Sequence, residues 1–555
     1  MFVQDHNTPQ SAAVKHRQTH GKAGFLRSRR FWLWTGSVVL AALIALGISA
    51  EYALHHVEPI LRKRVIETLS TRFQTQVQLD SLDISVLNGI SAKGEGLVVP
   101  GIATSGEVAT PLLKVKSFEF RTSLRSLMRT PTHVDTVYVQ GLEFRLPPKG
   151  ERPKLPHDNK KKGKISIVVD QIICTDAMVE IETNKPNKVP LEFDISRLTL
   201  THVGPGQPFH FVANLTNPKP VGDIAAHGNF GPYTIGSPAD TPVNGHYNFS
   251  HADLSTTKGI SGILSSTGDF SGTLGNIVVD GQTDTPDFAL DVSDHPVPLE
   301  TTFHAIVDGT NGDVTLDPVH AKLLSSTFTA RGSVTRTRGI PGHDIEMNVV
   351  MDHGRIEDIL QLGFKTTPPL MNGALSMHAR MSLPPGKVRV AEKIRLQGDF
   401  SITGATFNNP QTQNKMDMLS LRAQGEPRLA NPAGAAAVNE VSNMTGVFKA
   451  GDGKLDLPNL QYDLPGAQVL LQGSYTMDGK TFELHGIVRT RARASQMTTG
   501  WKAMLLKPLD PIFAKNGAGT QIPVKISGTK NAPHFGLDLH DKKNSWDKPL
   551  PAPPQ

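Results

Sequence analysis

The sequence is poor in cysteine, in aromatic residues and in charge. Over 555 positions it has one cysteine, 6% aromatic residues and 19% charged residues. A lone cysteine, Cys174, excludes a disulfide within the chain, so a core of sufficient size must stabilise the fold. Cys174 ends the apolar run IIC and is interpreted as a small buried hydrophobic residue rather than a nucleophile. The net charge of +6 comes from mostly dispersed basic residues, which argues against nucleic acid as a partner.

The motifs of common catalytic and cofactor sites are also missing. The sequence contains no phosphate-binding glycine-rich loop, no paired-cysteine or H-E-x-x-H metal pattern, and no G-x-S-x-G turn. His55 and His56 are adjacent but have no further ligands at a useful spacing. Acidic residues stand mostly at turns such as Asp308-Gly309, where turn chemistry explains them. We expect neither an enzyme nor a cofactor, although glycosidase carboxylates have no fixed spacing and keep an envelope hydrolase as the last alternative.

Near the N-terminus there is one long uncharged run. Residues 31–50 carry no charged side chain, and a hydrocarbon core of about 30 Å needs a helix of about 20 residues. The segment before the run is basic, which places residues 1–30 in the cytoplasm and the rest of the chain across the membrane. We predict a transmembrane helix over residues 31–52, with anchor residues Trp32, Trp34, Val38, Leu43 and Leu46. A cleavable signal peptide is the alternative, but the candidate site has the bulky Ile48 at its −3 position.

After this run the apolar period changes from helical to strand-like. Residues 53–75 have apolar side chains every three or four positions up to Phe73, which predicts an amphipathic helix. This helix either caps the first strands or lies on the membrane surface, and the two interpretations are compatible. Residues 76–145 and 165–541 are then dominated by short strand patterns. Between them, residues 146–164 are rich in lysine and proline and are interpreted as a solvated loop, with attraction to anionic headgroups as the alternative.

Strict alternation identifies a hairpin near the C-terminus. Residues 468–476 and 482–489 alternate on either side of the turn signal Asp478-Gly479, with one apolar face and one wetter face. The same alternation recurs in residues 328–335 and 396–407. The 50 glycines and 40 prolines of the sequence are also typical of many strands joined by turns. The predicted fold is therefore mainly β.

A short signature of glycine, one polar residue and then an aromatic residue or valine returns along the strands. It begins at Gly228, Gly268, Gly332, Gly398 and Gly473, at irregular spacings, and suits a long sheet that curls. Two helical interruptions are expected, at residues 354–364 and 494–515. In the second, a stripe of Met497, Trp501, Met504 and Leu505 is expected to cover an open end of the sheet, before Pro508 breaks the helix. Residues 542–555 are predicted to be a proline-rich disordered tail.

Both ends of the chain resemble AsmA-like proteins, a bacterial family related to TamB and YhdP. The resemblance rests on ILRKRVIETLSTRFQTQVQLDSLDISV after the apolar run and on DPIFAKNGAGTQIPVKISGTKNAPHFGLDL near the C-terminus. It implies a long curled antiparallel sheet that forms an apolar groove, anchored in the inner membrane and projecting into the periplasm. It also implies phospholipid transport toward the outer membrane, or outer-membrane homeostasis. The middle of the chain matches only in its β pattern, and the chain is short for this family.

Length limits the reach of such a groove. At roughly ten residues per strand, residues 165–541 have room for about 35 strands, and strands about 4.8 Å apart would extend at most about 170 Å. A protein partner in the periplasm or outer membrane, or a role over a shorter range, is therefore expected. The residues predicted to contact lipid are Val469, Leu471, Tyr475, Phe482, Leu484 and Val488. Alternation does not decide whether they face an open groove or a closed core.

Two functions from different classes remain open at this point. The first is an inner-membrane-anchored periplasmic protein that guides phospholipids along an apolar groove, with no catalytic residue. The second is a membrane-tethered assembly factor for outer-membrane proteins, which would bind polypeptide by strand addition at a sheet edge.

Overall fold

The computed structural model describes most of residues 76–538, with the longest gaps at 102–110, 147–166 and 431–439. Before residue 76 it describes only Lys63, Ile66, Glu67 and Ser70, and all four are helical. The predicted transmembrane helix over 31–52, its anchor residues, most of the amphipathic helix over 53–75 and the tail over 542–555 lie outside the described residues. Within the described residues, no helix is both long enough and apolar enough to span a membrane.

The described residues form a mainly β structure with one sheet of 24 strands. The strands in its first half are β1 (Ser81–Ser85), β2 (Ile90–Pro100), β3 (Pro111–Thr122), β4 (Thr132–Leu146), β5 (Ile167–Ile181), β6 (Leu191–Val203), β7 (Phe209–Pro218), β8 (Val221–Phe230), β9 (Pro242–Asp253), β10 (Ile260–Ser261), β11 (Ile263–Thr273) and β12 (Asn276–Leu290). Those in its second half are β13 (Val297–Val307), β14 (Val314–Leu323), β15 (Ser326–Thr335), β16 (Asp344–Arg355), β17 (Met371–Leu383), β18 (Arg395–Phe407), β19 (Ser442–Gly451), β20 (Lys454–Leu464), β21 (Ala467–Thr476), β22 (Phe482–Thr490), β23 (Thr520–Thr529) and β24 (Ala532–Leu537).

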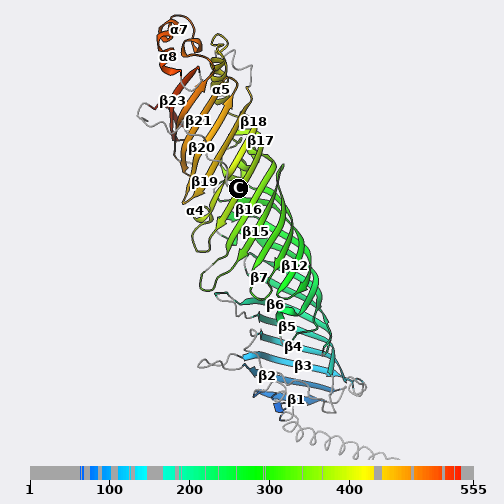
Figure 1. The fold of residues 1–555 in the computed structure, drawn as a ribbon. Coiled ribbons are helices and arrows are strands. Elements are labelled where there is room, and N and C mark those ends of the chain that lie inside the picture. The colour runs from blue at the N-terminus through cyan, green and yellow to red at the C-terminus, as the bar shows by residue number, and fades with distance from the viewer. Residues whose placement is uncertain are drawn as a thin grey trace, which may run out of the picture. The chain divides into compact units, whose positions relative to one another are not determined.

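The sheet is a meander in which neighbours in sequence pair with one another, except that β9 pairs with β11 and the two-residue β10 pairs with β12 (Figure 1). All pairings are antiparallel except that of β4 with β5, which is parallel. A parallel pair needs a connection that returns to the starting edge. The expected loop over residues 146–164 falls between these two strands, almost entirely outside the described residues. The estimate of about 35 strands was too high: the described part of residues 165–541 holds β5 to β24, and many of these strands are longer than the usual five or six residues.

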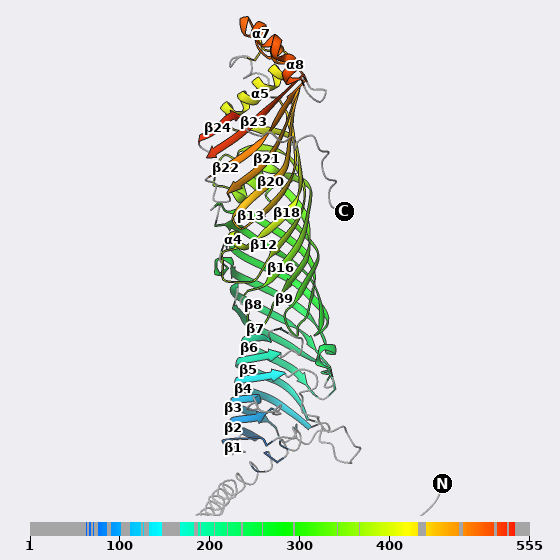
Figure 2. The ribbon, with the colours of Figure 1, turned by 60° about the vertical axis from the view of Figure 1, so that its left-hand side comes forward.

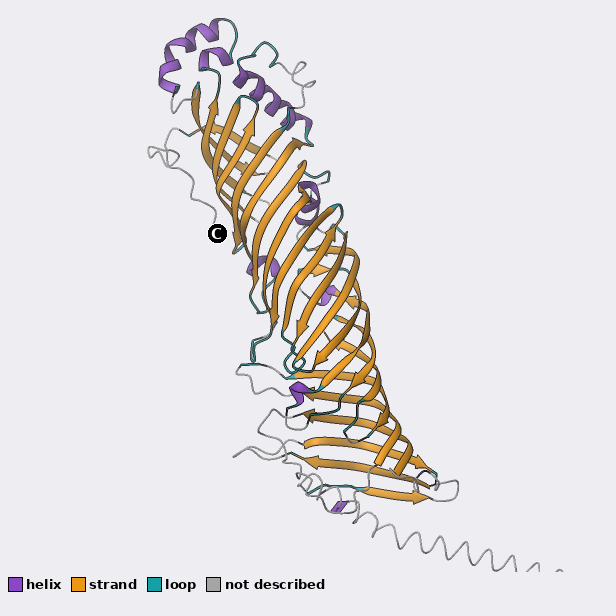
Figure 3. Cartoon of the chain, turned by 45° about the vertical axis from the view of Figure 1, so that its right-hand side comes forward, coloured by secondary structure: helices purple, strands orange, loops and turns teal. Residues whose placement is uncertain are grey.

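From β5 onward the turns alternate between two long edges of the sheet. We call the edge that carries the turns after β5, β7, β9, β12, β14, β16, β18, β20 and β22 the first edge, and the opposite one the second edge. The helices at the first edge are α3 (Ile356–Gly363), α5 (Pro410–Gln424) and the group η3 (Ala494–Met497), α7 (Trp501–Leu506), η4 (Lys507–Leu509) and α8 (Asp510–Phe513). The short α4 (Val390–Lys393) lies at the second edge. Figure 3 shows these helices in purple beside the orange strands.

Helix α3 confirms the expected interruption at 354–364, whereas α5 was not predicted. The α5 sequence does carry end signals. The Asn409 side chain accepts hydrogen bonds from the backbone amides of Gln411 and Thr412, Pro410 occupies the first turn, and Gly425 ends the helix in the left-handed region with φ of 89°. Its apolar periodicity is weak, however, because polar residues such as Gln413 and Asp417 lie on its buried side.

In two examples of the glycine signature, the aromatic residue lies over a glycine of the neighbouring strand. In the Gly398-Asp399-Phe400 example, Phe400 lies over Gly446 of the neighbouring strand, and a Cβ at Gly446 would be 2.9 Å from two atoms of the ring. In the Gly268-Asp269-Phe270 example, Phe270 lies over Gly245 in the same way, at 2.7 Å. Glycine on the adjacent strand thus leaves room for an aromatic ring to lie flat on the sheet instead of projecting from it.

A side chain at Gly446 should therefore destabilise the sheet. We expect Gly446→Ala to lower the free energy of unfolding by about 1–3 kcal/mol, because Phe400 must move away from the strand. Gly451→Ala on the same strand is the matched control, since the nearest atom to its Cβ would be 3.8 Å away. Urea unfolding followed by circular dichroism measures both. Equal midpoints for the two variants would contradict this role of Gly446.

Candidate functional site

One row of cross-strand partners is apolar without interruption across most strands of the sheet. Cross-strand partners in register share a face, so a row of partners can be followed from strand to strand. The row crosses β4 to β19, except the two-residue β10, through Val139, Cys174, Leu198, Ala213, Ala226, Tyr247, Gly268, Gly281, Phe303, Val319, Ala330, Val349, Ala379, Gly398 and Phe448. Every member is apolar, aromatic or glycine. We call the side that carries this row the apolar face.

The opposite face is polar along the same strands. Next to the row above, the partners are His227, His246, Asp269, Asp280 and His304. Two cross-strand pairs join them, with His246 Nδ1 3.0 Å from Asp269 Oδ1 and His304 Nδ1 2.8 Å from Asp280 Oδ1. Similar pairs join other strands, such as His378 with Asp399. This side faces water.

The sheet curls toward its apolar face. Ile181 at the end of β5 and Leu274 after β11 are both buried in one cluster, together with Val179, Phe193 and Ile277. Strands β5 and β6 are not neighbours of β12 in the sheet, so their apolar side chains can meet only if this face is the inside of the curl. Figure 2 shows the curved ribbon of strands around this region.

Contacts between the two edges hold the curl along a seam. Lys188 at the first edge forms an ion pair with Asp313 at the second edge, with Nζ 2.9 Å from Oδ2, and both side chains are largely buried. Farther along, Gly259 at the first edge lies against Val390 of α4 at the second. Farther still, the ring of Phe364 after α3 is 6.2 Å from that of Tyr475 on β21. No strand pairing crosses this seam among the described residues, so the sheet itself stays open there.

The inside of the curl is only partly covered. Along the middle strands, Phe211, Phe249, Phe270, Phe303 and Met347 on the apolar face are half-buried rather than fully buried. Glycines on the adjacent strands let the rings lie flat against the sheet, as described above for Phe270. The middle section is therefore a concave apolar surface that keeps some contact with solvent.

At the C-terminal end the same face is closed by α5. Met416, Leu419 and Ala423 of this helix pack against the cluster formed by Leu460, Tyr462, Leu464 and their neighbours on β21 and β22. Asn409 and Gly425 fix where this helix begins and ends. The apolar surface therefore changes from partly open to packed between β18 and β22.

The six residues predicted to contact lipid all lie on the apolar face at this packed end. Val469 is opposite Val488, Tyr475 is opposite Phe482, and Leu484 is opposite Gly473. Val469, Leu471 and Val488 are buried, with 6–9% of their surface exposed. Leu484 packs against the same cluster, while Tyr475 and Phe482 are half-buried and Tyr475 contacts the seam through Phe364. A ligand could reach the buried three only if α5 moved.

Sequence reasoning missed a group of hydroxyls within the apolar face. Tyr247 Oη lies 3.0 Å from Ser266 Oγ, which also donates to the Gln282 carbonyl at 3.0 Å. On the next strands Thr283 Oγ1 and Thr301 Oγ1 are 2.6 Å apart. Burial raises the pKa of the Tyr247 phenol, with the Ser266 hydrogen bond acting in the opposite sense. These hydroxyls satisfy one another, so they interrupt the apolar surface without exposing unpaired polar groups. Serine and threonine at alternate strand positions are the only sequence signal.

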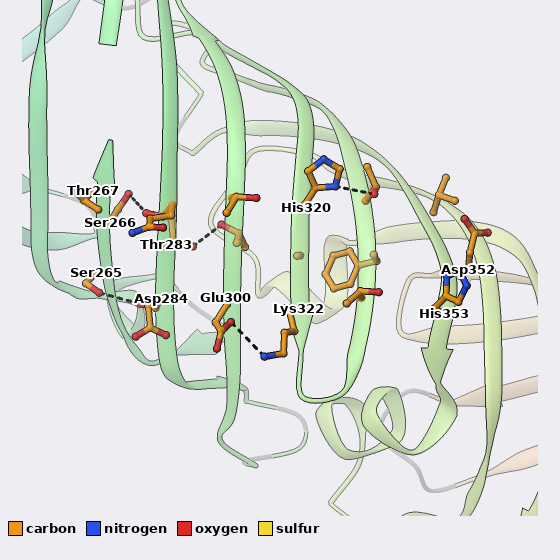
Figure 4. Close-up of a pocket in the computed structure, with 18 of the residues that line it drawn as sticks. Ser265, Ser266, Thr267, Thr283, Asp284, Glu300, His320, Lys322, Asp352 and His353 are labelled. Carbon is orange, nitrogen blue, oxygen red and sulfur yellow. Dashed lines mark hydrogen bonds and ion pairs between the residues drawn. The ribbon is translucent and has the colours of Figure 1, made fainter. Parts of the chain in front are cut away.

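A cavity of about 760 Å³ is lined by residues of β9 and of β11 to β16, most of them from the polar face (Figure 4). Its charged side chains are exposed, and Glu300 and Lys322 are 3.6 Å apart. His320 Nδ1 lies 3.3 Å from the hydroxyl of Thr329. In the part of the chain that the structure describes, no cluster of three or more His, Cys, Asp or Glu side chains could hold a metal ion.

Cys174 belongs to the apolar face rather than to any polar site. It is buried with Ala177, Ile195 and Ala213, and burial raises the pKa of its thiol to about 11. A thiol that stays protonated at neutral pH is a poor nucleophile. The interpretation of Cys174 as a buried hydrophobic residue is confirmed.

Comparisons with known protein families, with curated proteins and with solved structures give no match to this chain.

The two edges should separate at the seam when the charge of Lys188 in its ion pair with Asp313 is reversed. We expect Lys188→Glu to increase amide hydrogen exchange in residues 187–188 and 308–313, because two carboxylates would then face each other. The charge swap Lys188→Glu with Asp313→Lys should restore protection, and a cycle with the two single variants should give a coupling energy of about 0.5–1 kcal/mol for this partly buried pair. Exchange that is unchanged in the single variant would show that the edges are held elsewhere.

Proposed function

We propose that this chain is an AsmA-like protein that carries phospholipids along the inside of its curled sheet. In this proposal it is anchored in the bacterial inner membrane by residues 31–52, with its N-terminus in the cytoplasm and the sheet in the periplasm, and serves lipid homeostasis of the outer membrane. The observation that carries the proposal is the unbroken apolar row from Val139 on β4 to Phe448 on β19, on the inner side of an open curl. Its partners are phospholipids and the inner membrane, with a protein of the periplasm or outer membrane at the far end.

The physical need for such a surface is large. Exposing an acyl chain to water costs about 0.8 kcal/mol per methylene, so a chain of sixteen carbons costs about 12 kcal/mol. A continuous apolar surface lowers this barrier at every point along the path. No bond is made or broken, so no catalytic residue is required. A soluble domain has otherwise little reason to leave so much apolar surface partly exposed.

The form of the surface suits movement rather than tight binding. Rings that lie flat over glycines, as Phe270 does over Gly245, give few deep pockets in which an acyl chain would stop. The hydroxyls of Tyr247 and Ser266, and those of Thr283 and Thr301, are hydrogen-bonded to each other, so they do not require a hydrogen bond with a passing lipid. The lipid path proposed here runs over the half-buried middle section. Val469, Leu471 and Val488 lie beyond it under α5, and lipid contact there is proposed to follow displacement of α5.

The decisive test compares two neighbouring valines on β16. Val349 belongs to the apolar face, whereas Val350 lies on the polar face with 38% of its surface exposed. We expect phospholipid to copurify with the full chain, and Val349→Glu to reduce it several-fold, because a carboxylate within the groove repels acyl chains. Val350→Glu should leave it unchanged. Mass spectrometry of extracted lipids gives the amounts, and every variant keeps the same N-terminal segment.

Urea unfolding of both variants is the control for folding. Equal lipid content in the wild type and in both variants, with equal unfolding midpoints, would mean that the bound lipid belongs to the N-terminal segment. The lipid groove would then be abandoned.

One observation favours the assembly-factor alternative. Among the described residues β24 pairs only with β23, so its other edge has unpaired backbone groups that could accept a strand of another polypeptide. Strand addition at β24 needs no phospholipid and would be insensitive to Val349→Glu. The two functions are thus separated by the same pair of valine variants, assayed for envelope integrity in cells.

A further inference from the structure

The helical group between β22 and β23 exposes large apolar side chains. We call residues 494–514, which contain η3, α7, η4 and α8, the cap. Trp501 is 69% exposed, Met504 79%, Leu505 63% and Ile512 63%. The expectation that Trp501, Met504 and Leu505 cover the sheet was wrong, because all three are exposed. Only Met497 of the predicted stripe is partly buried, with its sulfur 3.6 Å from the Thr490 hydroxyl of β22. Figure 1 shows α7 and α8 beyond the strand ends.

The cap differs from an ordinary surface helix because large apolar side chains lie among its exposed residues. A helical segment in water normally turns its apolar side chains toward the rest of the protein. The side of the cap that turns away from the sheet is therefore suited to an apolar environment that the chain itself does not supply among its described residues.

Hydrogen bonds hold the cap in the conformation that exposes these apolar side chains. The carboxylate of Asp510 accepts hydrogen bonds from the Ser495 amide at 2.9 Å and the Ser495 hydroxyl at 2.6 Å, which tie α8 to η3. These bonds hold the pKa of Asp510 below its usual value. The hydroxyls of Thr490 and Thr520 both donate to the carbonyl of Ala492, at 2.9 and 3.0 Å, and fasten the start of the cap to β22 and β23.

Charge identifies the chemistry of the missing partner. Over residues 491–514 the basic side chains of Arg491, Arg493, Lys502 and Lys507 are all exposed, whereas the only acidic residue, Asp510, is buried. An exposed tryptophan and aliphatic side chains flanked by lysines match the interface of a bilayer with anionic headgroups. A second copy of the chain is disfavoured because two basic caps would repel each other.

We propose that the cap docks on the surface of a lipid bilayer that contains anionic headgroups, inserting Trp501, Met504, Leu505 and Ile512. This contact is separate from the groove and from the N-terminal segment, and it would position the C-terminal end of the sheet at a membrane. It goes beyond the proposed function, because the groove could bind lipid whether or not the cap touches a bilayer.

The test uses the full chain held in nanodiscs of neutral phosphatidylcholine. Liposomes with about one third phosphatidylglycerol are added, and the nanodiscs that float with them are measured. We expect the wild type to float with these liposomes and not with pure phosphatidylcholine. Trp501→Glu with Met504→Glu should reduce flotation at least tenfold. Val388→Glu, at another exposed apolar residue near α4 with 53% exposure, is the control and should have no effect.

A second variant changes only charge, so the test does not depend on correct folding of the Trp501 and Met504 variant. Lys502→Glu with Lys507→Glu alters only exposed side chains and should weaken flotation by about fivefold per lysine, in a manner that salt suppresses. Wild-type nanodiscs that stay in solution, or a Trp501 and Met504 variant that floats as well as the wild type, would overturn the proposal. Pairing of nanodiscs through the cap without liposome binding would also overturn it and make the surface an interface between copies. Loss of flotation with full retention of copurified lipid would leave the groove proposal intact.

Discussion

The described part of the chain depends on one constraint: its long sheet has an apolar face, and no second layer of strands covers that face within the described residues. Such a face must be hidden, occupied or exposed, and exposure on this scale promotes aggregation. Curling toward the apolar face removes part of it from water, as the burial of Ile181 against Leu274 shows. The curl brings the first edge of early strands against the second edge of later ones. The ion pair of Lys188 with Asp313 and the contact of Phe364 with Tyr475 then hold the two edges together.

Several local features follow from the same constraint. A tight curl crowds side chains on the inner face, and glycines opposite Phe270 and Phe400 relieve that crowding by letting the rings lie flat. At the C-terminal end α5 replaces the curl as the cover, so the surface there becomes an ordinary packed core. The middle section keeps half-buried apolar side chains such as Phe270 and Phe303 on the inside of the curl. The proposed lipid path runs over these side chains, while the polar face carries exposed histidine and aspartate pairs.

Local patterns in the sequence predicted much of this arrangement. Alternation around Asp478-Gly479 predicted the pairing of β21 with β22 and placed Val469 and Val488 on one face, because a strand's period of two is a local property. The helix within residues 354–364 was predicted because the helical period is also a local property of the sequence. Helix α5 was missed because its buried side carries Gln413 and Asp417, although Asn409-Pro410 and Gly425 marked its ends. The parallel pairing of β4 with β5, the direction of the curl and the Lys188 seam join residues far apart in sequence, and no local pattern encodes them. Burial of Leu471 under α5 was unpredictable for the same reason.

The central claim is that acyl chains touch the inside of the curl. The most direct measurement places a photo-crosslinking residue, one position at a time, at residues 301–305 of β13 in the full chain and detects covalently attached phospholipid by mass spectrometry. Positions 301, 303 and 305 lie on the apolar face, and positions 302 and 304 on the polar face. The account predicts phospholipid adducts that alternate along the strand, strong at 303 and absent at 302 and 304. Adducts that are equal at all five positions, or confined to 302 and 304, would contradict it.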